Sequence, residues 1–376
     1  MRTLALLAAA LPALPALLAG CTTPYRPPQF MEADATFPGL IDFTARAPSK
    51  KTDVLLVHGM CTHDATWAKE TVDTLAAQLA ANVTPGPAAR AAAPGIEIVP
   101  IQVDTPQGAI RFKSLIWSPL TTPIKQQLCY DQTDKSPICT GTPPFTPVRA
   151  RLNAKVKDWL MDDCLPDALI YEGAAREQIQ LRMRDAILAA TEDGDPDAPL
   201  VVVSESLGSK ILFDTLLRML DEPAQSRAAQ VAEREVQRMA WLVMAANQIP
   251  LLQMAEQPLD AGAGAADTRP AAMQAAPMDS LQKLLQKRRA PVADRRRAAA
   301  PLTLVAFSDP GDLLTYTLPP ERYRDGATAV FNVLVSNAPT YFGLLEDPVR
   351  AHMDYLSNPD VGSLVACGQP RSPLCK

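Results

Sequence analysis

The chain is poor in histidine and carries no excess of positive charge. Its 376 residues include three histidines, and 36 lysines and arginines stand against 41 aspartates and glutamates, for a net charge of −5. Because histidine is a common metal ligand, its scarcity argues against a metal site, and the cysteine spacing resembles no zinc site. The acidic balance gives no support to nucleic-acid binding, which relies on basic surfaces. We therefore expect neither a metal nor a nucleic-acid partner.

The chain also lacks an apolar run of membrane-spanning length. Residues 1–20 carry one positive charge and then about 15 apolar residues, which is typical of a secretory signal peptide and short for a membrane span. Leu18-Ala19-Gly20-Cys21 resembles the bacterial lipobox, in which the cysteine is lipidated and becomes the mature N-terminus. Thr22 follows, with no aspartate beside the cysteine; in Gram-negative bacteria this resembles sorting to the outer membrane. The resemblance implies a lipid anchor at Cys21 and a place in the cell envelope, on the periplasmic side of the outer membrane. An ordinary signal peptide with a chance cysteine is the alternative.

Six cysteines remain when Cys21 is set aside, and an even number in an exported chain suggests disulfides. Six cysteines allow fifteen pairings, and the sequence does not choose among them. The short loops favour Cys129–Cys139 and Cys367–Cys375, which leaves Cys61 to pair with Cys164.

One stretch has the pattern of a nucleophile elbow. The apolar run Leu200–Val203 predicts a strand buried on both faces, and the residues after Ser206 have helical spacing. Ser204 and Gly208 flank Ser206, which gives S-x-S-x-G where G-x-S-x-G is more usual. Such a turn lifts the serine hydroxyl above the strand and beside the N-terminus of a helix, where free N–H groups favour negative charge. Ser206 is the candidate nucleophile.

A serine nucleophile needs a base and an orienting acid. His352 is the one histidine that follows Ser206 in the chain, as the order serine, acid, histidine requires. The expected strand 302–307 runs into Ser308-Asp309-Pro310-Gly311-Asp312, so Asp312 and Asp309 compete for the acid. Asp312 is favoured because an apolar pair follows it, whereas Asp309 precedes a proline and can instead shape the turn.

A third segment, Val54-Leu55-Leu56-Val57-His58-Gly59-Met60, predicts a buried strand ending in a loop. Together with the elbow, the acid loop and His352, it resembles the α/β-hydrolase superfamily over residues 50 to 360. The departure is Ser204, where many members carry glycine. The resemblance implies a mostly parallel sheet with helices on both faces, and acyl-hydrolase chemistry without a cofactor. It also implies an oxyanion hole formed by the N–H of Leu207 and a donor at Gly59 or Met60.

The remaining pattern predicts one α/β-hydrolase domain over 51–376, preceded by a proline-rich tether at 21–50. Two regions fit the core poorly: 118–167 is a cap insertion in our interpretation, and 256–300 a flexible insertion with a helix at 279–289. Alternating strands and helices favour a parallel sheet covered on both faces. The strands are expected at 53–58, 96–102, 111–117, 200–205, 239–246 and 302–307, and the helices at 65–82, 151–163, 173–192, 208–221 and 225–237.

The first functional hypothesis is a monomeric serine hydrolase that cleaves carboxylic esters, lipid esters among them, and meets the membrane through its N-terminal lipid. A thioesterase or amidase with the same triad is a second possibility. A catalytically silent lipoprotein that binds a partner at the cell envelope is a third, because fold alone does not prove activity.

Overall fold

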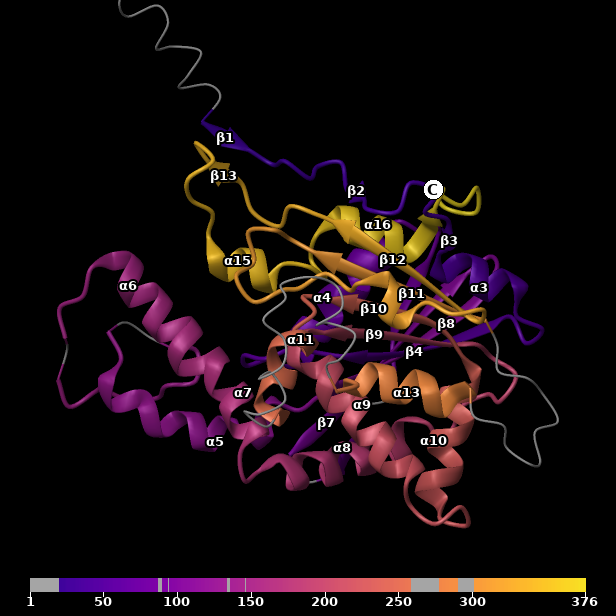
Figure 1. Cartoon of the computed structure of the whole chain (residues 1–376), viewed down its shortest axis with the longest axis horizontal. Helices are drawn as coiled ribbons and strands as arrows, with labels where there is room; N and C mark the ends of the chain where they lie inside the picture. The colour runs from indigo at the N-terminus through magenta and orange to yellow at the C-terminus, as the bar shows by residue number, and fades with distance from the viewer. Residues whose placement is uncertain are drawn as a thin grey trace, which may run out of the picture.

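A mostly parallel β-sheet forms the centre of the molecule (Figure 1). The structure, a computed structural model, describes residues 20–86, 90–93, 95–133, 136–145, 147–257, 277–289 and 301–376. Within these residues the sheet has ten strands, in the order β2-β12-β11-β10-β9-β4-β8-β7-β5, with β6 paired to β7. The strands are β2 (Gln29–Phe30), β4 (Lys51–Val57), β5 (Asn82–Pro85), β6 (Arg90–Ala93), β7 (Ile96–Thr105), β8 (Gly108–Ile116), β9 (Leu200–Glu205), β10 (Met239–Ala245), β11 (Leu302–Ser308) and β12 (Thr328–Leu334).

In this described part of the chain, six neighbouring strands run parallel, from β8 through β4, β9, β10 and β11 to β12. Their carboxyl ends therefore meet at one edge of the sheet, where ligands bind in open α/β folds. Antiparallel strands flank this parallel block, with β7 on one side and β2 on the other. The expectation of a mainly parallel α/β sheet is confirmed at this level.

Helices cover both faces of the sheet because successive residues of each strand point to opposite sides. In β4, Leu55 and Val57 pack with one group of helices and Val54 and Leu56 with the other. The first group is α8 (Arg176–Ala190), α9 (Ser206–Leu220), α10 (Arg227–Arg238) and α13 (Ser280–Arg289). The second is α3 (Leu40–Arg46), α4 (Ala65–Ala76) and α16 (Pro359–Cys367).

Residues 118–172 form a helical excursion that projects to one side of the sheet, at the left of Figure 1. It contains α5 (Thr122–Lys125), α6 (Arg151–Lys155), a π-helix (Val156–Cys164), α7 (Leu165–Glu172) and two 3₁₀ turns (Ser118–Leu120 and Gln126–Asp131). The helix expected over 151–163 thus continues to residue 172. We call this part the α5–α7 segment.

The expected tether at 21–50 is largely part of the folded domain. Phe37, Leu40 and Ile41 are buried in the core, and α3 packs on the sheet. Short strands also attach this region: β1 (Cys21–Thr22) pairs with β13 (Thr340–Tyr341), and β3 (Phe37–Pro38) pairs with β14 (Gly368–Gln369). The prediction of a tether, which was based on the prolines, is wrong for this part. The apolar residues between the prolines bury enough surface to hold the segment on the domain.

Other differences are smaller. The strand β12 was not expected, and β7 runs antiparallel. The helix α4 ends at Ala76, not at residue 82. Most of the expected insertion 256–300 lies outside the described residues, as does the signal peptide up to residue 19, but α13 lies at 280–289, as expected. Short helices α11 (Ile249–Leu252), α14 (Pro320–Tyr323) and α15 (Pro348–Met353) and a 3₁₀ turn (Gln253–Glu256) complete the described structure. None of the described helices has the length and apolar character needed to span a membrane.

Candidate active site

The turn between β9 and α9 carries Ser206 at the carboxyl edge of the sheet. Ser206 has a φ of +50°, a strained conformation for a residue with a side chain. Small neighbours are needed at this turn: a Cβ on Gly208 would lie 2.1 Å from the carbonyl oxygen of His58, and one on Gly59 would lie 2.8 Å from the Cβ of Ser206. Ser204, in the position where glycine is more usual, is buried, and its hydroxyl accepts a hydrogen bond from Ser209.

His352 lies on α15, close to Ser206. Asp347 caps this helix by accepting hydrogen bonds from two backbone N–H groups of its first turn. The Nε2 of His352 is 3.2 Å from the Oγ of Ser206, and its Nδ1 is 2.9 and 3.0 Å from the two carboxylate oxygens of Asp312. All three side chains are buried, so these contacts are largely shielded from water.

The carboxylate of Asp312 is itself held by two further donors. One oxygen accepts from the N–H of Leu314 at 2.9 Å, and the other accepts from the hydroxyl of Tyr355 at 3.0 Å. Tyr355 is fully buried and was not singled out in the sequence. Its place three residues after His352 was the one available signal in the sequence.

Asp309, the competing acid, faces a different set of groups. Its carboxylate accepts hydrogen bonds from the N–H groups of Gly311 and Asn337, at 2.8 and 2.6 Å, and so shapes the turn before Asp312. Burial raises the pKa of Asp309, and burial together with the neighbouring Asp309 raises that of Glu346 to about 7. The structure thus brings Asp312, and not Asp309, against His352.

The loop after β4 lies against Ser206, as the candidate oxyanion hole requires, since a Cβ on Gly59 would meet the Cβ of Ser206. Leu207 is in the first turn of α9, where the N–H groups have no carbonyl partner one turn earlier in the helix. Burial raises the pKa of Glu205 to about 8, opposed by the nearby N–H of Gly59. Neither carboxyl oxygen of Glu205 has a hydrogen-bond partner of normal geometry among the described residues. Because the N–H of Gly59 faces Glu205, Met60 is the better candidate for the second donor.

Buried ionic contacts join this loop to the α5–α7 segment. The backbone N–H of Cys61 donates to Asp167 at 2.8 Å, and that of Thr62 donates to Asp163 at 3.1 Å. The ammonium group of Lys125, wholly buried, lies 2.7 Å from Asp163 and 3.1 Å from Asp167. Burial raises the pKa of Asp167 to about 6, and Lys125 opposes that rise. No sequence pattern predicted this network, because its members come from separate elements.

The structure contains the two disulfides that the short loops favoured, Cys129–Cys139 and Cys367–Cys375, and the remaining pair, Cys61–Cys164. The Cys61–Cys164 disulfide joins the loop after β4 to the π-helix and so reinforces the ionic contacts there. Cys21, the candidate lipidation site, is exposed and has no disulfide partner.

The two other histidines are part of the scaffold. His58 stacks on Trp117 with ring centroids 5.0 Å apart, and its Nε2 accepts from the N–H of Trp117 at 2.9 Å. Burial, with His63 nearby, lowers the pKa of His58 well below its ordinary value, and burial lowers that of His63 to about 4. Both rings are therefore neutral near pH 7.

A cavity of about 120 Å³ lies beside His352. Its lining is mainly apolar and comes from the π-helix, the acid loop and α15: Leu160, Cys164, Asp312, Leu313, Leu314, Pro348, Val349, His352 and Met353. Leu160 of the π-helix lines this cavity, whereas its neighbours Trp159 and Met161 are exposed. Gln248, at the carboxyl end of β10, has its amide nitrogen 3.4 Å from the Nε2 of His352, while Asn247 hydrogen-bonds a neighbouring loop.

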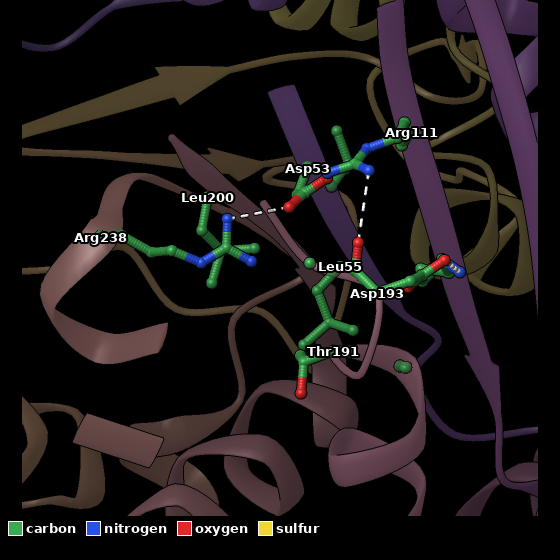
Figure 2. Close-up of a pocket in the computed structure, with 11 residues that line it drawn as sticks. Asp53, Leu55, Arg111, Thr191, Asp193, Leu200 and Arg238 are labelled. Carbon is green, nitrogen blue, oxygen red and sulfur yellow. Dashed lines mark hydrogen bonds and ion pairs between the residues drawn. The ribbon is translucent and has the colours of Figure 1, made fainter. Parts of the chain in front are cut away.

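A second, smaller cavity lies near the amino ends of the strands, far along the sheet from Ser206. Figure 2 shows Asp53 of β4 between the guanidinium groups of Arg111 and Arg238. The Asp53 carboxylate is 2.5 Å from Arg111 and 2.9 Å from Arg238. The cavity holds only about 20 Å³, and the charges around it are paired, so we interpret it as a structural cluster.

The chain matches no known protein family model. No curated protein has significant sequence similarity to it either. Within the described residues, no group of three or more histidine, cysteine, aspartate or glutamate side chains is arranged to hold a metal ion.

Proposed function

We propose that the protein is a serine hydrolase of the α/β-hydrolase type that cleaves carboxylic esters. One observation supports this most strongly: the hydroxyl of Ser206, the imidazole of His352 and the carboxylate of Asp312 form a continuous series of hydrogen-bond distances in a buried site. This is the arrangement by which a serine is activated, a histidine accepts its proton, and an acid orients the imidazole. The strained turn at Ser206 adds support, since such strain is concentrated at functional sites.

In the proposed reaction, the Oγ of Ser206 attacks the acyl carbon while the Nε2 of His352 takes the hydroxyl proton. Asp312 holds the imidazole and stabilises its charged form. The N–H groups of Leu207 and Met60 stabilise the oxyanion. Collapse of this intermediate breaks the ester bond, and His352 protonates the leaving alkoxide. Water then attacks the acyl-enzyme with the same histidine as base, and the carboxylic acid leaves.

The cavity beside His352 suits an apolar part of the substrate, because its lining is mainly hydrocarbon. Ser206 is 1 % exposed, so an ester reaches it only after side chains around the site move. We further propose that Cys21 carries a lipid anchor and that the enzyme works at the periplasmic face of the outer membrane. The lipobox-like segment and the exposed Cys21 support this part.

A fluorophosphonate probe tests the nucleophile directly. We expect the folded protein to become labelled, and both Ser206→Ala and His352→Ala to abolish labelling and lower ester turnover by about 10⁴-fold or more. Ser209→Ala is the matched control, because this serine lies one turn later on α9 and is also buried; it should keep the label. Absence of labelling in the folded protein would favour the silent binding protein instead.

The bond that is cleaved needs a separate comparison. We expect rates on matched substrates to be higher for the ester than for the amide or thioester. A series of nitrophenyl esters of increasing acyl length then measures how much chain the cavity accepts. Faster turnover of the thioester or the amide would keep the triad but replace the substrate class.

A further inference from the structure

A tight turn between β13 and α15 exposes an unusual set of side chains. Residues 341–345, here called the apolar turn, read Tyr-Phe-Gly-Leu-Leu, and no charged residue occurs from 336 to 345. Phe342 is 61 % exposed, Leu344 88 % and Leu345 56 %. Turns usually carry Gly, Pro, Asn, Asp or Ser, and neighbouring exposed apolar side chains mark interaction sites. Packing within the domain does not explain these exposed apolar side chains, which indicates that they contact something else.

The backbone of the apolar turn is well defined. The N–H of Tyr341 donates to the carbonyl of Leu345 at 2.8 Å, and the N–H of Leu344 donates back to Tyr341 at 3.0 Å. Phe342 and Gly343 have φ values of +53° and +65°, which close the turn. The side chains of Phe342 and Leu344 are thus presented to solvent by hydrogen-bonded backbone.

The candidate anchor leaves the domain at this same turn. Cys21, the N-terminal residue of the proposed processed lipoprotein, pairs with Tyr341 across the two short strands. The hydroxyls of Thr22 and Thr340 are 2.7 Å apart, which secures the pairing. Figure 1 shows β1 and β13 together at one end of the molecule, with α15 next to them. An apolar chain attached here, whether acyl groups on Cys21 or the apolar residues before it, starts beside Phe342.

We propose that the apolar turn inserts into the lipid bilayer beside the anchor and forms a second membrane contact. The proposal relies on the membrane-anchor part of the proposed function. A lipid surface is the partner that matches this turn. Its exposed side chains are uncharged, and they lie next to Cys21, where the anchor is attached. Aromatic and leucine side chains at the interface add binding energy in proportion to the apolar area that they bury.

Two contacts fix an orientation that one flexible anchor cannot. The helix α15 begins three residues after the apolar turn and carries His352, so insertion holds this end of the catalytic site near the lipid surface. The cavity lined by Val349, Pro348 and Leu313 lies at the same end of the molecule. An ester embedded in the bilayer would then have a short path to the site.

Fluorescence in vesicles tests the contact without any need for activity. The processed protein, purified from the membranes of expressing cells and placed in vesicles of phosphatidylethanolamine and phosphatidylglycerol, would carry Leu344→Trp or, as control, Val83→Trp on the far strand β5, where the native side chain is 38 % exposed. With brominated acyl chains in the lipids, we expect the extra emission of Leu344→Trp to fall by about twofold, since interfacial side chains reach the acyl boundary. The emission of Val83→Trp should not change.

Each other outcome has a distinct meaning. A protein that floats with the vesicles but shows equal quenching at both positions overturns the membrane contact and leaves the anchor intact. A protein that does not float overturns the anchor, and the contact with it. A turn that is unquenched but supports dimers, lost in Leu344→Asp, would have a second copy of the chain as its partner and would also overturn the proposal. Loss of fluorophosphonate labelling in Ser206→Ala is independent of all three.

Discussion

Buried charged groups have different surroundings at the two edges of the central sheet that are formed by the amino and carboxyl ends of its strands. At the amino edge, the carboxylate of Asp53 lies between Arg111 and Arg238, and the cluster in Figure 2 is built from opposite charges. At the carboxyl edge, burial raises the pKa of Glu205 to about 8. Burial and the nearby carboxylate of Asp309 raise the pKa of Glu346 to about 7. The charges of the amino-edge cluster are neutralised by ion pairs. The carboxyl edge also contains the ion pairs of Lys125, but next to Ser206 and Asp309 it holds acidic groups with raised pKa values.

This difference favours the carboxyl edge as the location of the functional site. Buried ion pairs hold elements in register, and they are found throughout protein structures. Strained backbone, raised pKa values and a cavity occurring together are typical of a functional site. The carboxyl edge combines all three around Ser206, whereas the cavity at the amino edge is small and its charges are paired. We therefore expect changes at the carboxyl edge to reduce activity and changes at the amino edge to reduce stability.

The largest effect expected from this comparison is on Asp312, the acid of the proposed triad. Asp312→Asn removes the charge that orients and stabilises the imidazole of His352, so we expect kcat to fall by about 10³- to 10⁴-fold. Asp309→Asn, three residues earlier, serves as the matched control, and its turnover should fall by less than about tenfold because it contacts the turn and not His352. Ester hydrolysis of folded protein, measured near pH 7, provides the comparison. If Asp309→Asn were the more damaging change, the assignment of the acid would be wrong.

The nucleophile turn was open to prediction because it is a local feature. A buried strand, two small residues around a serine and a following helix are consecutive in the chain, and local geometry sets the turn. His352 followed from scarcity and chain order. The acid stayed between Asp309 and Asp312, because both leave the same strand and only the three-dimensional turn decides which one faces the imidazole.

The contacts that support the site could not be predicted in the same way. Lys125, Asp163 and Asp167 are distant in sequence from the loop that they hold, and each alone resembles a surface charge. Tyr355 joins the acid loop only through tertiary packing. The attachment of residues 21–50 was missed for a related reason: proline content indicates an extended chain but does not report whether the residues between the prolines are buried.

The second largest effect is expected on stability, from a change at the amino edge. Asp53→Asn leaves Arg111 and Arg238 without their shared carboxylate, so we expect the free energy of unfolding to fall by about 2–4 kcal/mol. Asp193→Asn is the control at the same edge, because Asp193 pairs with Lys113 but its side chain is 68 % exposed; its effect should stay below about 1 kcal/mol. Urea unfolding with the disulfides intact measures both. A loss of turnover in folded Asp53→Asn, at unchanged stability, would contradict the division between the edges.

The smallest expected effect concerns pH and the carboxyl edge. Glu205 has a pKa raised to about 8 by burial, against about 4.5 in the unfolded chain, so between these values the folded protein keeps a proton that the unfolded chain has lost. Stability from this group is fully present below pH 4.5 and is lost as the pH rises towards 8. We expect the free energy of unfolding to fall between pH 5 and pH 6.5 by about 2 kcal/mol more in the native protein than in Glu205→Gln.

The same titration links Glu205 to catalysis. Below pH 8 its carboxyl group is neutral and adds no charge beside the oxyanion that forms at Ser206. Above pH 8 a carboxylate next to the nucleophile opposes that oxyanion, so turnover of a soluble ester should decline in the native protein and persist in Glu205→Gln. Glu177→Gln, on an exposed side chain, is the control and should follow the native profile. Matching profiles for all three proteins would show that Glu205 does not affect turnover. The carboxyl edge would then differ from the amino edge in its strained turn, its cavity and Glu346.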